Sequence, residues 1–81
     1  MEYVNKFLKE TIAACTKIDI NEIDLNTSIS ESPEWDSLAH MQILSILSDK
    51  FKFEITSEVI INLSSYDTLS KYLTSLKNQT K

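Results

Sequence analysis

The fold of this chain is most clearly indicated by residues 34–41, which read Glu34-Trp35-Asp36-Ser37-Leu38-Ala39-His40-Met41. Asp36 and Ser37 are both good residues for capping the N-terminus of a helix. From Ser37 to about Phe51, apolar residues then recur at helical spacing, namely Leu38, Met41, Ile43, Leu44, Ile46, Leu47 and Phe51. The only proline, Pro33, lies upstream, where it cannot interrupt this pattern. The segment therefore predicts a helix that begins at Ser37.

Upstream of residue 34, the sequence predicts another helix and then a long loop. From Glu2 to about Thr16 the apolar residues follow helical spacing, at Val4, Phe7, Leu8, Ile12 and Cys15. Residues 17–36 break that pattern with Asp, Asn, Ser and Thr, which predicts a loop. A short helical turn around Asn21–Asp24 fits this stretch. Its spaced apolar residues suggest a loop held against the core, and they are Ile20, Ile23, Leu25 and Ile29.

Downstream, residues 57–62 can be read in two ways. The run Val59-Ile60-Ile61 is β-branched and is compatible with a short strand. We favour a short helix, because Thr56 or Ser57 can cap it and a lone strand would have no partner. The sequence leaves the choice open.

A last helix is predicted from Tyr66 to about Lys77 by apolar residues three or four positions apart. Ser64 with Asp67 three residues later has the spacing of a capping box. The predicted fold is all-α, a four-helix bundle of three main helices and one short helix with a long loop after the first. A length of 81 residues allows one domain, residues 1–81.

Composition and charge exclude several classes of protein. The formal net charge is −4, and the 8 basic residues are all lysines scattered along the chain, so the basic footprint of a nucleic-acid binder is missing. No apolar run approaches the ~20 residues that cross a bilayer, and the N-terminus lacks the pattern of a secretion signal. The single cysteine, Cys15, allows no internal disulfide. We expect a cytoplasmic protein without a membrane span or a nucleic-acid partner.

The motif Trp35-Asp36-Ser37-Leu38 at a helix start resembles the phosphopantetheine attachment motif of acyl carrier proteins, in the form of many stand-alone members. The resemblance covers nearly the whole chain. It includes Phe51-Lys52-Phe53-Glu54-Ile55 and the stretch from Leu63-Ser64-Ser65-Tyr66 through Lys71-Tyr72-Leu73. It implies an acyl-carrier-like bundle in which Ser37 carries covalent 4'-phosphopantetheine, whose thiol holds an acyl or aminoacyl group as a thioester.

The same resemblance implies a carrier that is not itself an enzyme. Its partners would be a phosphopantetheinyl transferase, which uses Asp36 to help hold its metal, and enzymes that load or receive acyl groups. Leu38 would offer these partners an apolar contact. Further candidates for partner contact are Trp35, His40 as a surface histidine, Met41 and Gln42. For Trp35 we favour a structural role, in which the ring packs the loop onto the bundle. We expect a monomer, the simplest state for a shuttle, and no metal site, because a second histidine is absent.

Two other interpretations of Ser37 remain open at this point. A helix N-terminus favours a phosphate, because its backbone N–H groups are unpaired and its dipole end is positive. Serine is also common at helix starts as a simple cap. If Ser37 is only a cap, the chain is a helical interaction module. A miniature hydrolase using Ser37 and His40, one turn apart, is poorly supported, because the chain has no glycine elbow or oxyanion loop.

Met41, Leu44 and Leu47 either line a pocket for the cargo or belong to the core, and helical spacing fits both. Cys15 is predicted to be a small buried apolar residue.

The chain departs from the familiar fatty-acid carriers in two respects. Their second helix is strongly acidic, whereas this stretch carries one acid and one base, within Gln42, Ser45, Ser48, Asp49 and Lys50. Glu34 replaces the usual glycine two residues before the motif. These departures favour a dedicated carrier in a specialised biosynthetic pathway.

Overall fold

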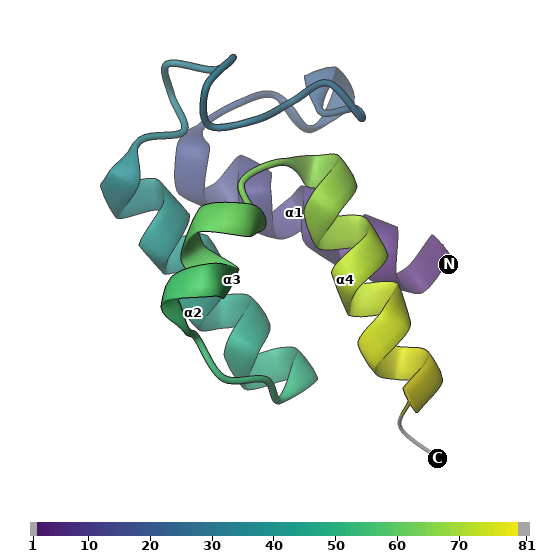
Figure 1. Ribbon diagram of the computed structural model, residues 1–81. Coiled ribbons are helices and arrows are strands. Elements are labelled where there is room, and N and C mark those ends of the chain that lie inside the picture. The colour runs from purple at the N-terminus through teal and green to yellow at the C-terminus, as the bar shows by residue number, and fades with distance from the viewer. Residues whose placement is uncertain (1, 80–81) are drawn as a thin grey trace.

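The computed structural model describes residues 2–79, and in these residues it contains helices and no strand (Figure 1). The elements are α1 (Glu2–Thr16), the 3₁₀ turn η1 (Ile20–Glu22), α2 (Ser37–Phe51), α3 (Ser57–Asn62) and α4 (Tyr66–Gln79). The all-α prediction is confirmed, and residues 57–62 are helical. Among the described helices, none combines the length and the apolar character that crossing a bilayer requires.

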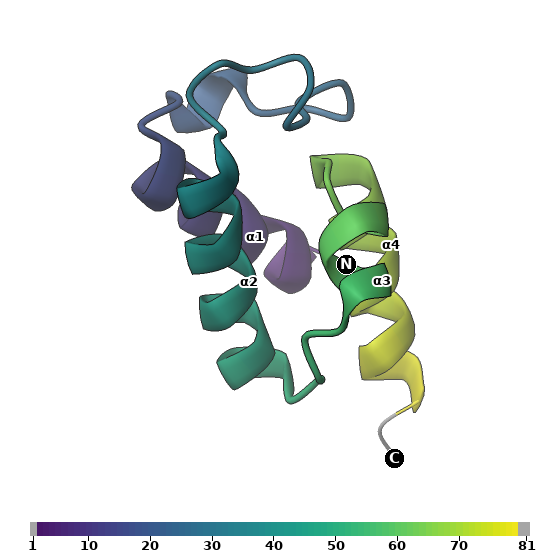
Figure 2. The same cartoon turned by 60° about the vertical axis from the view of Figure 1, so that its left-hand side comes forward.

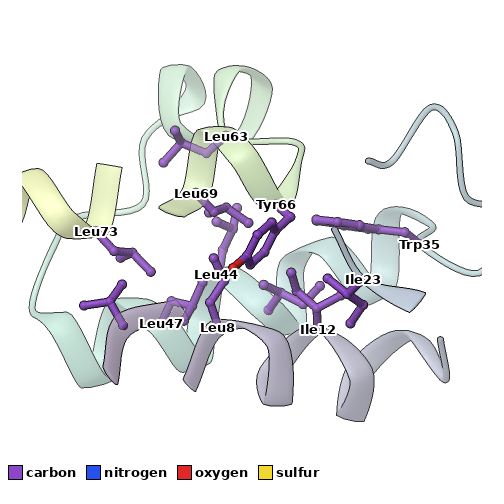
Figure 3. Packing of buried hydrophobic residues seen from close by; sticks show 12 residues of the cluster. Leu8, Ile12, Ile23, Trp35, Leu44, Leu47, Leu63, Tyr66, Leu69 and Leu73 are labelled. Carbon is purple, nitrogen blue, oxygen red and sulfur yellow. The ribbon is translucent and has the colours of Figure 1, made fainter. Parts of the chain in front are cut away.

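The core lies where α1, α2 and α4 meet. Each of these helices buries one apolar stripe at helical spacing: Val4, Leu8 and Ile12 from α1, Ile43, Leu44 and Leu47 from α2, and Leu69 and Leu73 from α4. Figure 3 shows side chains from all three helices pointing into this common interior. Full burial of one such side chain contributes about 1.5–3 kcal/mol. The core therefore fixes the position of α2, the helix that begins at Ser37.

The long loop between α1 and α2 crosses one end of the bundle (Figure 2). It is held there by Ile23, which is 2% exposed, and by an isolated antiparallel bridge between Ser28 and Ser65. In this bridge the Ile29 N–H donates to Ser64 O at 2.9 Å. Of the four apolar residues expected to pin the loop, Ile23 and Ile29 pack on the core, whereas Ile20 and Leu25 are exposed.

The helical turn in this loop starts one residue and ends two residues earlier than predicted. It spans Ile20–Glu22, because the Asp19 carboxylate accepts from Asn21 N–H and caps the turn. The loop therefore begins with a short, capped element before it runs towards the bridge.

The predicted capping box of α4 is wrong by one residue. Ser65 is the cap: its hydroxyl accepts from Thr68 N–H at 3.1 Å, and the Thr68 hydroxyl accepts from Ser65 N–H at 3.2 Å. Ser64 cannot start the helix because its carbonyl belongs to the bridge with the loop. Asp67 instead forms an ion pair with Lys71 one turn later, at 3.3 Å.

Candidate functional site

Ser37 is the first residue of α2, and Asp36 is the N-cap. The Asp36 carboxylate accepts from Ala39 N–H at 2.9 Å, and its backbone is extended (φ −93°, ψ −174°). Of the two capping candidates in the sequence, Asp36 and not Ser37 is therefore the N-cap. Ser37 is exposed, and no hydrogen bond among residues 3–76, whose side chains are described, occupies its hydroxyl. The structure thus leaves a hydroxyl accessible at a fixed position.

The local electrostatics favour an anion attached to Ser37. In the first turn of a helix the N–H groups have no intrahelical acceptor, and Asp36 satisfies only the one on Ala39. The positive end of the dipole of α2, a helix of 15 residues, lies at the same point. A phosphate bonded to Ser37 would sit beside unpaired N–H groups of the first turn.

A pocket of about 300 Å³ opens beside Ser37, between α2, α3 and the loop. Its lining is largely apolar and comprises Ile29, Ser37, His40, Met41, Ile60, Ile61 and Ser64. Met41 lines it as the sequence suggested. Leu44 and Leu47 do not line this pocket, because both are fully buried in the core.

Trp35 and His40 are both buried. For Trp35 this is the packing role that the sequence favours, whereas for His40 it contradicts the prediction of a surface histidine. Trp35 is 1% exposed and His40 3% exposed. The Trp35 indole N–H donates to His40 Nδ1 at 3.0 Å, so Nδ1 is unprotonated and Nε2 carries the hydrogen. Nε2 donates this hydrogen to the carbonyl of Ile60 at 2.9 Å. Sequence reasoning missed this pair because the partner on α3 lies 20 residues away.

This hydrogen bonding also argues against the hydrolase interpretation. A general base needs a free ring nitrogen within hydrogen-bond reach of the nucleophile. Both nitrogens of His40 are bonded to Trp35 and Ile60, and neither is bonded to Ser37. The Ser37–His40 pair is therefore not arranged for nucleophilic catalysis.

The surface around Ser37 carries exposed apolar side chains. Leu38 is 70% exposed and Met41 is 41% exposed, and Gln42 follows them on the outer face of α2. On α3, Ile61 is 71% exposed, and sequence reasoning did not single it out. The sequence offers a weak signal for it, namely three consecutive β-branched apolar residues on a short helix, more than one narrow apolar face accommodates.

Cys15 lies on α1 and is half-buried against the core rather than fully buried. Burial raises the pKa of its thiol, which disfavours the reactive thiolate at neutral pH. Among the described residues no group of acidic, histidine and cysteine side chains is arranged to hold a metal ion.

The family comparison agrees with this geometry. A family model described as the phosphopantetheine attachment site matches residues 6–73, which include all of α2 and the serine at its start. None of the curated proteins compared with the sequence matches it. The match extends over most of the chain and includes the elements that build the pocket beside Ser37. The chain is therefore a member of the acyl-carrier type of the phosphopantetheine attachment family, a carrier whose covalent cofactor is 4'-phosphopantetheine.

Proposed function

We propose that this protein carries acyl or aminoacyl groups as thioesters on a phosphopantetheine arm attached to Ser37. The observation that carries the proposal is the Ser37 hydroxyl, exposed and without a hydrogen bond among the described side chains, at the first residue of α2. A serine that only stabilised the helix would have its hydroxyl engaged, and here Asp36 performs the capping.

The residues present fit the cofactor. The attachment chemistry needs a hydroxyl that a transferase can reach and a place for the phosphodiester, and Ser37 and the first turn of α2 supply both. The bound cofactor supplies a thiol that forms the thioester. Ser37 fixes one end of the arm, and Leu38 and Met41 give the surrounding surface its apolar character. Cys15, with its raised pKa, lies on a different helix from Ser37 and is not proposed to hold cargo.

The surface of α2 supports a dedicated set of partners. Its exposed side chains beyond Ser37 are mainly apolar or uncharged, and Asp49 and Lys50 together contribute no net charge. Docking on this helix would rest on apolar and polar contact, because electrostatic steering needs an excess of one sign of charge. We therefore place the carrier in a specialised pathway, with its own loading and receiving enzymes. Efficient turnover by general fatty-acid enzymes would contradict this assignment.

The decisive experiment is the intact mass of the apo protein after incubation with coenzyme A, magnesium and a broad-specificity phosphopantetheinyl transferase. The expected result is a gain of one phosphopantetheine in the wild type and no gain in Ser37→Ala. Ser30→Ala is a matched control, because Ser30 is an exposed loop serine outside the helix start, and it should be modified like the wild type.

Folded apo protein that gains no mass would contradict the proposal and leave an interaction module as the better interpretation. A gain that survives Ser37→Ala would show that the arm is attached elsewhere. Circular dichroism of both serine variants establishes that they are folded.

A further inference from the structure

The lining of the pocket beside Ser37 includes the buried side chain of His40. The rest of the lining is three isoleucines, Met41, and the two serines Ser37 and Ser64. His40 is a buried residue on the core-facing side of α2, which continues with Leu44 and Leu47, one and two turns further along the helix. The pocket and the main core are therefore neighbours along one face of α2, and His40 stands between them.

His40 joins three segments of the chain. It accepts from Trp35 in the loop before α2 and donates to Ile60 on α3, at 3.0 and 2.9 Å. The ring of Trp35 also lies against the imidazole, with centroids 5.9 Å apart. Both side chains are almost completely buried, so water does not compete for these hydrogen bonds. We call this set of contacts the His40 latch.

For α3 the latch adds a directional contact to apolar packing, because Val59 and Ile60 are only partly buried against the core. α3 has six residues, and none of them is fully buried. The carbonyl of Ile60 falls in the last turn, where the helix offers it no N–H donor of its own, and His40 supplies the donor. A group that moved from the pocket towards Leu44 would have to separate α3 from α2. That movement would leave the Ile60 carbonyl and the His40 ring unpaired in an apolar interior, which is costly.

We propose that His40 is a specificity-determining residue, which closes the inner end of the pocket beside Ser37 so that the protein shelters short acyl groups and leaves the remainder of a long chain in solvent. The inference rests on the proposed attachment of the arm to Ser37. It assigns a substrate class to the carrier, namely acyl groups compact enough for a pocket of about 300 Å³. His40 acts here as a positioning residue and takes no part in making or breaking the thioester.

The test compares two cargoes in three proteins. Wild type, His40→Leu and His40→Gln are converted to the holo form and loaded with butyryl or lauroyl groups, and the rise in Tm over the holo form is measured for each. A sheltered cargo stabilises the fold because it binds the native state and not the unfolded chain. Each comparison is made within one variant, so any general loss of stability cancels.

In the wild type, butyryl should raise the Tm, and lauroyl should raise it by no more than butyryl does. In His40→Leu, which lacks both hydrogen bonds and continues the apolar stripe, lauroyl should give the larger rise. His40→Gln supplies one acceptor and one donor and should behave like the wild type. A larger rise for lauroyl in the wild type, equal rises in His40→Leu, or no rise with butyryl would each overturn the proposal.

A second measurement uses the wild type alone, in case a variant fails to fold. Amide hydrogen exchange of α3 should be the same in the butyryl and lauroyl forms if the latch stays closed. A change in α3 specific to lauroyl would overturn the inference. Failure of the arm to attach is visible beforehand as an unchanged mass, and that outcome would defeat the proposed function instead.

Discussion

The two ends of α2 are held by different kinds of interaction. At its N-terminal end, directional hydrogen bonds connect Trp35, His40 and Ile60, and Asp36 caps the first turn. At its C-terminal end, Phe51 meets Phe7 of α1 edge to face, with centroids 5.8 Å apart, and Leu47 one turn earlier is fully buried.

The difference follows from what each end has to do. Apolar contacts depend mainly on buried area and tolerate small changes of angle, whereas hydrogen bonds fix a distance and a direction. Ser37 must remain exposed and yet hold one position, so it cannot be fixed by burial. Trp35, two residues before it, and His40, three residues after it, are fixed instead. The C-terminal end presents no proposed site residue and contributes mainly to stability.

The largest effect should come from the apolar end. Leu47→Ala is expected to lower the free energy of unfolding by about 2–5 kcal/mol, because Leu47 is fully buried and the surrounding core cannot collapse onto the cavity. Leu38→Ala is the matched control on the same helix: at 70% exposure it should change stability by less than about 0.5 kcal/mol. Urea denaturation of both variants measures the difference.

The rate of arm attachment should distinguish Leu38→Ala and Leu47→Ala in the opposite order from stability. Leu38→Ala should slow attachment of the arm, because Leu38 lies next to Ser37 on the surface that the transferase approaches. Leu47→Ala, assayed under conditions where it is folded, should be modified at the wild-type rate. Equal losses of stability in the two variants would refute the division of α2 into a stabilising end and a presenting end.

The sequence predicted the parts of the fold that depend on local signals. The start of α2 followed from capping residues beside a periodic apolar run. For residues 57–62 the sequence favoured a helix capped by Thr56 or Ser57 without excluding a strand, and the structure shows the helix α3 with Thr56 as its cap. The cap of α4 could not be predicted, because Ser64 and Ser65 are equally good candidates locally. The bridge to Ile29 decides between them, and that contact joins segments far apart in the sequence.

The candidate site was predicted less completely than the fold. Ser37 and Asp36 belong to a contiguous motif, so their positions relative to the helix could be derived. His40 was assigned to the surface because histidine is polar and lies one turn from an exposed serine. Its burial depends on a carbonyl of α3 that needs a donor, and no periodic pattern in the sequence reports an unpaired backbone group.

A smaller effect is expected at the cap itself. Asp36→Ala should lower the free energy of unfolding by about 1 kcal/mol, because the N–H of Ala39 loses its acceptor. Asp36→Asn keeps an acceptor at the same place and should leave stability nearly unchanged. Thermal unfolding of the two variants separates capping from charge.

If Asp36 also helps the transferase to hold its metal, both substitutions should slow attachment of the arm, since neither retains the carboxylate. The Asn variant is the informative one, because its fold is expected to be intact. If Asp36→Asn received the arm at the wild-type rate, the role of Asp36 would be only to cap α2.

The smallest effect should be a gain in stability at the opposite end of α2. Lys52 adopts a left-handed backbone (φ 60°, ψ 61°) where its N–H donates to Ser48 O at 2.8 Å and ends the helix. Glycine is favoured at such positions, yet this chain contains none. Lys52→Gly should raise the free energy of unfolding by about 0.5–1 kcal/mol, because it relieves a left-handed penalty of about 1–2 kcal/mol and loses part of that gain to the more flexible unfolded chain.

Lys52→Ala is the control, since alanine keeps the Cβ atom and should bring no gain. Urea denaturation measures both variants, and the rate of arm attachment is followed in parallel. That rate should not change in Lys52→Gly, because the C-terminal end stabilises α2 without contacting the residues around Ser37. A gain in stability that also altered the rate would mean that the two ends are coupled through the helix. The hydrogen bonds at Trp35, His40 and Ile60 would then not be sufficient to fix the position of Ser37.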